Sequence, residues 1–290
     1  MSLLLTAIIW GAGFIGVKDA LRTIEPLHLT AIRFSFAGII LSIIFFKRLK
    51  KVKKEDIYAS LIVGFLLFAG FVFQTIGMKY TTPGKNAFLT GLNVVMVPFF
   101  YWALKKKFPG WQTIVAAFLS LLGIGLLTMQ NGSIATNFGD LMTIVCAVFF
   151  AVHITAIGHF SKGMDTVVLA ILQMLVAAVL SVICAALFEP SMPLSNINSG
   201  NIYSIGYLVI FSTMLAFLIQ NVAQKYTLST HAAIILCMES VFGSIFSVLY
   251  FKEIFSPSMI VGCTIILVAI ILSEVKIDFS NKKRRETLIK

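Results

Sequence analysis

The sequence predicts an all-α integral membrane protein with ten transmembrane helices. The chain has 290 residues, of which 59% are hydrophobic and 12% charged, whereas a soluble domain carries about a quarter of its residues as charged types. Its polar residues gather between apolar runs of about 20 residues, the length at which a helix crosses the bilayer core. These runs do not alternate apolar and polar residues as barrel strands do. Because backbone groups in lipid must be hydrogen-bonded internally, the runs are predicted to be helices.

Short breaks separate the predicted spans. Pro26, Pro83 and Pro257 lie at or near first helical positions, where the missing N–H costs little. Residues 47–54 include six lysines or arginines and are too charged to remain in lipid. Residues 131–133, Asn-Gly-Ser, are turn-forming. The ten spans are expected at residues 2–22, 26–46, 58–79, 83–104, 111–129, 140–161, 166–188, 202–225, 230–251 and 257–275.

Positive charge predicts the orientation of these spans. With a cytoplasmic N-terminus, 17 of the 23 lysines and arginines fall on the inside, five fall on the outside and Arg33 lies within a span. Because lysine and arginine are retained on the cytoplasmic side, both termini are expected in the cytoplasm. The protein is accordingly expected to be a multi-pass protein of the bacterial inner membrane. The net charge of +11 then needs no nucleic acid, and the basic tail is expected to meet anionic lipid.

A weak internal repeat divides the chain into two halves. Aligning Gln74 with Gln220 without a gap pairs residues 79–81 with 225–227, which are Lys-Tyr-Thr in both copies. Because each half holds five spans, an odd number, the second copy is expected to be inverted. Inverted repeats place a site near the bilayer midplane and permit alternating access, which favours a carrier. The predicted units are a first repeat (1–130), a second repeat (139–276) and a basic cytoplasmic tail (277–290).

Several segments carry a resemblance to a known family: Trp10–Phe14, Arg33-Phe34, Gln74–Tyr80, Thr81–Pro98, Met238–Gly243 and Phe251–Glu253. Over nearly its whole length, the chain resembles the EamA-type transporters of the drug/metabolite transporter superfamily. The resemblance implies ten helices, a central cavity and export of small metabolites, often amino acids, from the bacterial cytoplasm. The superfamily also contains sugar-nucleotide and triose-phosphate carriers, so the fold does not specify the cargo.

Two positions depart from the family pattern. Ser240 replaces the proline of the Leu-Glu-Pro-Val-Phe-Ala pattern, and Lys107 occupies the first-repeat position that corresponds to Glu253. Glu253 is therefore expected to be peripheral. In the first repeat, Pro98 is predicted to bend the fourth helix near Asn93, because proline removes a backbone hydrogen bond.

Ionisable and amide side chains inside the spans are the first candidates for a substrate site, because polar groups in a bilayer are costly and usually functional. Glu239 lies near the middle of the ninth span and is predicted to bind a substrate ammonium or a proton; a helix–helix hydrogen bond is the alternative. Asn93 is its repeat equivalent, either a second site residue or an interhelical hydrogen-bonding group. His153 is a candidate proton relay or a packing residue.

Each of the other candidates has two possible roles, which are to line a cavity or to support the fold. Gln74 and Gln220 are repeat-related polar residues inside their helix ends. Trp10 and Tyr101 can stack on an organic substrate or serve as packing and interfacial anchors. Arg33 is expected about 10 Å deep, within snorkelling range, and paired with Asp19 or Glu25, which favours a structural role.

Enzymatic functions receive little support. The sequence has no phosphate-binding loop and no His-Glu-x-x-His pattern. The four cysteines, all within spans, lack paired metal-ligand spacing, so they are expected to be packing residues and no cofactor or metal is expected. Transport would use a gradient, with protons as a candidate coupling ion, and the inverted repeat favours a monomer. A membrane-embedded lipid-modifying enzyme and a passive metabolite channel remain the alternatives.

Overall fold

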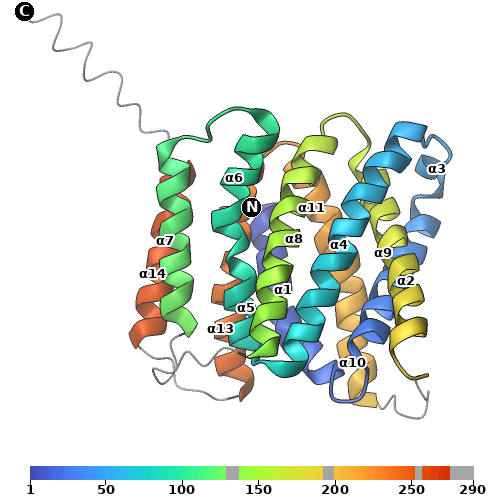
Figure 1. The fold of residues 1–290 in the computed structure, drawn as a ribbon, viewed down its shortest axis with the longest axis horizontal. Coiled ribbons are helices and arrows are strands. Elements are labelled where there is room, and N and C mark those ends of the chain that lie inside the picture. The colour runs from blue at the N-terminus through green and yellow to red at the C-terminus, as the bar shows by residue number, and fades with distance from the viewer. Residues whose placement is uncertain (129–136, 192–198, 252–256, 275–290) are drawn as a thin grey trace, which may run out of the picture.

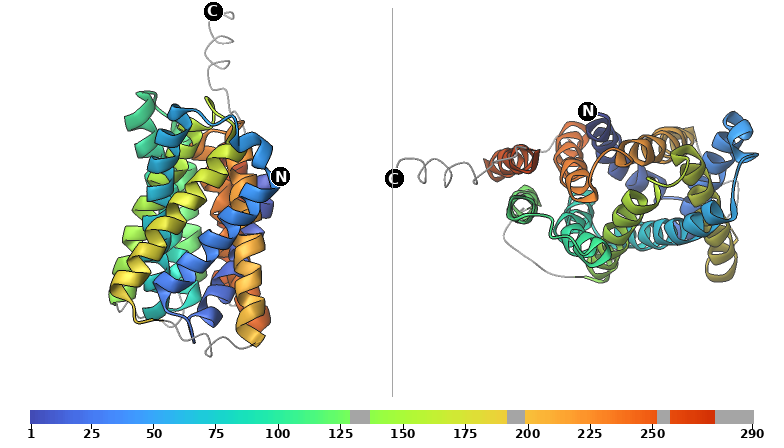
Figure 2. Two further views of the ribbon diagram at one scale, coloured as in Figure 1. Left: turned by 90° about the vertical axis from the view of Figure 1, so that its right-hand side faces the viewer. Right: turned by 90° about the horizontal axis from the view of Figure 1, so that it is seen from above.

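The computed structural model describes residues 1–128, 137–191, 199–251 and 257–274 of the chain, and its regular elements there are all helices. They run roughly antiparallel in an elongated bundle, with α7 (Trp111–Thr128) and α14 (Pro257–Glu274) side by side at one extremity (Figures 1 and 2). The tail after residue 274, Lys252 and Glu253 lie outside the described residues. Within the described residues, eight helices are long and apolar enough to cross a membrane: Ser2–Ala20, Pro26–Ile44, Lys54–Tyr80, Pro83–Lys105, Phe138–Phe160, Thr166–Phe188, Asn201–Gln224 and Ser229–Tyr250.

The two remaining predicted spans also correspond to helices. Within α7 and α14, the apolar stretches Trp111–Leu126 and Ile260–Leu272 are shorter than the other eight. Large apolar side chains, Phe65 and Leu122 among them, are exposed on the outward faces of the bundle. In a soluble protein such faces would be a liability, whereas in a bilayer they meet lipid.

Two of the membrane-length helices are interrupted near their middle. The first divides into α5 (Pro83–Gly91) and α6 (Asn93–Lys105) at Leu92, and the second into α12 (Ser229–Leu236) and α13 (Met238–Phe251) at Cys237. Pro98 lies within α6, and the interruption at Leu92 is adjacent to Asn93, near which the sequence predicts a bend. Removing the proline N–H loosens the preceding turn, where the Val95 N–H donates to the Leu92 carbonyl, three residues back, at 3.2 Å.

A third helix changes its winding along its length. It begins as α10 (Ser199–Tyr207), continues as the π-helical segment η2 (Leu208–Leu215) and ends as α11 (Ala216–Gln224). Within η2, the Thr213 hydroxyl donates to the Leu208 carbonyl, five residues back, at 2.7 Å. π-Helical segments are rare and are frequent at functional sites.

Close backbone approach joins α4 (Lys54–Tyr80) to α8 (Phe138–Phe160). A Cβ at Gly77 would lie 2.3 Å from the Thr143 hydroxyl oxygen, and a Cβ at Gly139 would lie 2.6 Å from the Gly77 carbonyl. Small residues at such crossings allow the van der Waals packing that holds membrane helices together.

Polar contacts between helices lie at both ends of the bundle, and among the described residues they are more numerous at one end. We call the end with segments 45–53, 106–110 and 161–165 the basic end, and the end with segments 21–25 and 81–82 the opposite end. The opposite end contains many polar contacts between helices. Lys79 pairs with Glu25, Lys85 with Asp140 at 2.6 Å, and the Ser204 hydroxyl donates to Asp19 at 2.8 Å.

A further contact at the opposite end joins the first half of the chain to the second. The Glu189 carboxylate, directly after α9 (Thr166–Phe188), accepts the backbone N–H groups of Leu27 and His28 at 2.8 and 2.9 Å. These N–H groups belong to the first turn of α2 (Pro26–Ile44), where backbone donors have no partner within the helix. Glu189 therefore caps a helix that lies far from it in the sequence.

A central cavity as the candidate functional site

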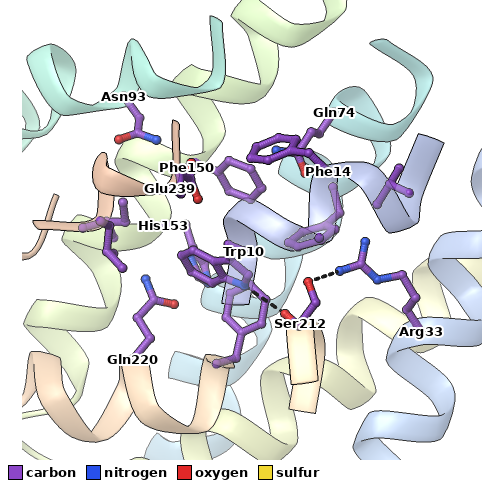
Figure 3. Close-up of a pocket in the computed structure, with 16 residues that line it drawn as sticks. Trp10, Phe14, Arg33, Gln74, Asn93, Phe150, His153, Ser212, Gln220 and Glu239 are labelled. Atoms are coloured by element: carbon purple, nitrogen blue, oxygen red, sulfur yellow. Dashed lines mark hydrogen bonds between the residues drawn. The ribbon is translucent and has the colours of Figure 1, made fainter. Parts of the chain in front are cut away.

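A cavity lies inside the bundle, with about 590 Å³ of space free of protein atoms, including the part open to solvent. Sixteen of the described residues line it (Figure 3), and they come from both halves of the chain. The lining includes six of the seven residues that the sequence identifies as site candidates: Trp10, Gln74, Asn93, His153, Gln220 and Glu239. Tyr101 is not among the lining residues; it lies farther along α6, more than two turns beyond Asn93.

The two helix interruptions bring Asn93 and Glu239 to the cavity. Asn93 is the first residue of α6 and Glu239 the second of α13, so each follows directly on an interruption. Both side chains are 7% exposed. Neither has a side-chain hydrogen bond to another described residue, and Figure 3 shows both on the same side of the cavity. Their polar groups are thus free to contact a ligand.

The other predicted polar residues are partly engaged. His153 Nε2 lies 2.9 Å from Gln173 Oε1, which is the packing and hydrogen-bonding role that the sequence offers as the alternative to a proton relay. Gln74 Nε2 donates to the Thr90 hydroxyl at 3.2 Å. In contrast, Gln220 Oε1 is buried without a hydrogen-bond partner among the described residues, so this oxygen is an acceptor left for a ligand or water.

Aromatic rings form the apolar wall of the cavity. Trp10 lies 5.0 Å from Phe217, which lies 5.6 Å from Phe71, and Phe71 in turn lies 5.4 Å from Phe150, all between ring centroids. The Trp10 Nε1–H donates to the Ser212 carbonyl in η2 at 2.9 Å (Figure 3). An apolar wall with a few placed polar groups is typical of small-molecule sites.

Arg33 lines the cavity, whereas the sequence predicts that it reaches towards the membrane surface and pairs with Asp19 or Glu25. Its predicted partners bind elsewhere, because Asp19 contacts Arg22 and Ser204 and Glu25 pairs with Lys79. Arg33 does not snorkel but is 2% exposed and points inward. On α2 it shares a buried stripe with residues 29, 37 and 41. That four-residue spacing is visible in the sequence, but the lipid-facing side of the helix is also apolar, so the inward side is not distinguished.

Two contacts from η2 and one aromatic ring hold the Arg33 guanidinium. Its Nε donates to the Thr213 hydroxyl at 3.1 Å, and its Nη2 donates to the Ser212 hydroxyl at 3.2 Å. Its Cζ lies 4.8 Å from the centroid of the Phe71 ring, a distance at which cation–π attraction operates. Gly13 leaves room for this arrangement, since a Cβ there would lie 2.9 Å from the Ser212 hydroxyl oxygen.

A bundle of membrane-length apolar helices around a buried cavity with polar groups is the architecture expected of a membrane transporter of small molecules. The chain belongs to the EamA-like transporter family, whose model matches residues 1–129 and 137–274. The family assignment confirms the resemblance that the sequence carries. Because members of this family are transporters, the assignment is also consistent with the prediction that the protein is not an enzyme.

Proteins with similar sequences are also named as transporters. The chain is 32% identical over 277 residues to an uncharacterized transporter of Archaeoglobus fulgidus, covering 96% of this chain and 86% of that one. It is 25% identical over 286 residues to the S-adenosylmethionine/S-adenosylhomocysteine transporter of Chlamydia muridarum, covering 90% and 89%. A solved crystal structure, 20% identical, superimposes with a TM-score of 0.76 over 94% of this chain and 95% of that one, which supports the fold.

Proposed function

We propose that this protein is a secondary transporter that exports small metabolites, amino acids or related organic compounds, by alternating access across the bacterial inner membrane. The observation that carries the proposal is the placement of Asn93 and Glu239. They occupy equivalent positions in the two predicted repeats, each follows a helix interruption, and both line one cavity. Interrupted helices that meet at a shared site are the arrangement expected of inverted-repeat carriers.

The proposed architecture is ten spans in two inverted repeats, 1–130 and 139–276, with both termini in the cytoplasm. α7 and α14 would be the fifth span of each repeat, and their contact with one another fits that equivalence. In this orientation the basic end faces the cytoplasm, as the positive-inside rule requires. The polar contacts of the opposite end would then close the outer side and break during each transport cycle.

Glu239 is proposed to bind a substrate ammonium or a proton. A carboxylate at membrane depth is costly unless a cation or proton offsets its charge. Among the described residues, no lysine, arginine or histidine forms an ion pair with it. A ligand that brings positive charge would therefore be favoured here, and protons are the candidate coupling ion.

The relative from Chlamydia muridarum, named for S-adenosylmethionine and S-adenosylhomocysteine, suggests cargo to test. Both compounds contain an amino acid group and an aromatic base. An aromatic wall that includes Trp10 and Phe150, with a nearby carboxylate from Glu239, is chemically suited to cargo of this kind.

The test is flux in proteoliposomes. Purified protein is reconstituted, and uptake of radiolabelled amino acids and S-adenosylmethionine is measured with and without a pH gradient. Saturable flux of one class is expected, with at least a tenfold loss in Glu239→Gln and none in the control Glu55→Gln, whose side chain is exposed at the start of α4. Full flux in Glu239→Gln would remove this residue from the mechanism. Flux that never saturates would instead indicate a channel.

A further inference from the structure

Arg33 presents unused hydrogen-bond donors inside the cavity. A guanidinium carries five N–H donors, and the bonds to Thr213 and Ser212 engage Nε and one hydrogen of Nη2. The described residues provide no acceptor for Nη1. The side chain is nonetheless 2% exposed and lines the cavity, so the unused face of its planar fork is directed at the ligand space.

The charges around the cavity are few. Among the described lining residues, the side chains with an ordinary formal charge are Arg33 and Glu239. They form no ion pair with one another, and Figure 3 shows them on opposite sides of Trp10. A buried charge without a partner is strongly unfavourable, so an anion at Arg33 would stabilise the occupied cavity relative to the empty one.

We propose that Arg33, oriented by Ser212 and Thr213, binds the carboxylate of the transported substrate. This inference rests on the proposed function and deepens it by naming an acidic group that the cargo must carry. The guanidinium fork matches the two oxygens of a carboxylate and binds it with two parallel N–H···O bonds. A single carboxylate neutralises the one cation. A phosphate dianion would leave an excess negative charge in a cavity that also contains Glu239.

A purely structural role for Arg33 makes a different prediction. If the guanidinium only braces α2 against η2, its loss would weaken the fold but would not alter the choice between charged and neutral ligands. Selectivity for the carboxylate is therefore the decisive readout, because only direct contact with the ligand changes it.

The experiment compares matched ligand pairs on purified full-length protein. Equilibrium binding and proteoliposome flux are measured for L-phenylalanine, L-methionine and L-glutamine, each against its carboxamide, which keeps the ammonium and side chain but lacks the negative charge. The wild-type protein should prefer at least one carboxylate over its amide by about 10- to 100-fold, the range for loss of a charge-assisted hydrogen bond. Arg33→Gln should abolish this preference, and Arg33→Lys should retain part of it.

Two further variants keep the test decisive. Arg22→Gln removes an arginine at the opposite end that is 69% exposed and should leave the preference unchanged. If Arg33→Gln does not insert, Ser212→Ala combined with Thr213→Val removes both hydroxyl acceptors while keeping the cation, and should reduce the preference severalfold.

The outcomes separate this inference from the proposed function. Equal binding of acid and amide in the wild type, binding of no carboxylate, or a preference that survives Arg33→Gln would each overturn the carboxylate subsite. Saturable flux together with equal binding of acid and amide would support the transport function but not the carboxylate subsite. Arg33-dependent carboxylate binding without any flux would support the subsite and count against transport.

Discussion

Replacing Glu189 with alanine tests how the opposite end is held together. The substitution removes the acceptor for two backbone N–H groups in the first turn of α2 and for His28 Nδ1, which lies 2.7 Å from the carboxylate. A carboxylate at a helix N-terminus is also favoured by the helix dipole. A hydrogen bond to a charged group contributes about 1.5–3 kcal/mol. Because the Glu189 side chain is 11% exposed and water can reach the freed donors, the expected loss in free energy of unfolding is about 2 kcal/mol in total.

Heating the detergent-purified protein with a thiol-reactive fluorophore measures this loss. Cys146 and Cys237 are free and buried, so they react only as the bundle opens. A loss of about 2 kcal/mol corresponds to a fall in Tm of about 4–8 °C for a chain of this size. Glu189→Gln keeps one carbonyl oxygen as acceptor and should show about half the fall. Glu55→Ala is the matched control, because it also removes a carboxylate from the first turn of a helix but at an exposed position. A Tm for Glu189→Ala equal to that of the control would refute the reasoning.

Three other changes are open to test. Gly77→Ala places a methyl group 2.3 Å from the Thr143 hydroxyl oxygen and should destabilise the α4–α8 crossing by about 1–3 kcal/mol; an unchanged Tm in the same assay would contradict that packing. Trp10→Phe keeps an aromatic ring but loses the hydrogen bond to Ser212, for an expected cost of about 1 kcal/mol, and a Tm equal to wild type would show that this bond contributes nothing. Lys51→Cys, with the native cysteines removed, should resist an impermeant thiol reagent in intact cells, whereas labelling would reverse the proposed orientation.

The positions of the helices follow from the sequence because their length and apolarity are set by the bilayer. The predicted span at 166–188 coincides with α9, and that at 2–22 ends within two residues of α1 (Ser2–Ala20). The winding within a helix is less visible. No proline marks the interruption at Cys237, and nothing local in 208–215 signals a π-helix, because these features arise from packing between helices.

The candidate site was predictable where a polar side chain stands out against an apolar run. Glu239 and Asn93 are such residues, and both line the cavity. Arg33 also stands out, but its depth alone is compatible with snorkelling to the surface. Its inward position depends on the Ser212 and Thr213 hydroxyls, which a helix 180 residues away supplies. The sequence does not indicate that pairing.

Because η2 is π-helical, an insertion or deletion within it would change which side chains face the cavity and therefore which cargo is bound. A π-helical segment fits more residues into each turn than an α-helix does, so removing one residue from Leu208–Leu215 would restore ordinary α-helical winding with little rotation of the helix beyond it. Gln220 in α11 would keep its direction, whereas Ser212 and Thr213 would lose the winding that presents both of them to Arg33. A relative that lacks the extra residue would therefore keep the residue at the position of Gln220 on the cavity and present different side chains to the position of Arg33. A single change of length in η2 would therefore alter the recognition of the ligand in one step, whereas the same change by substitution would need several steps.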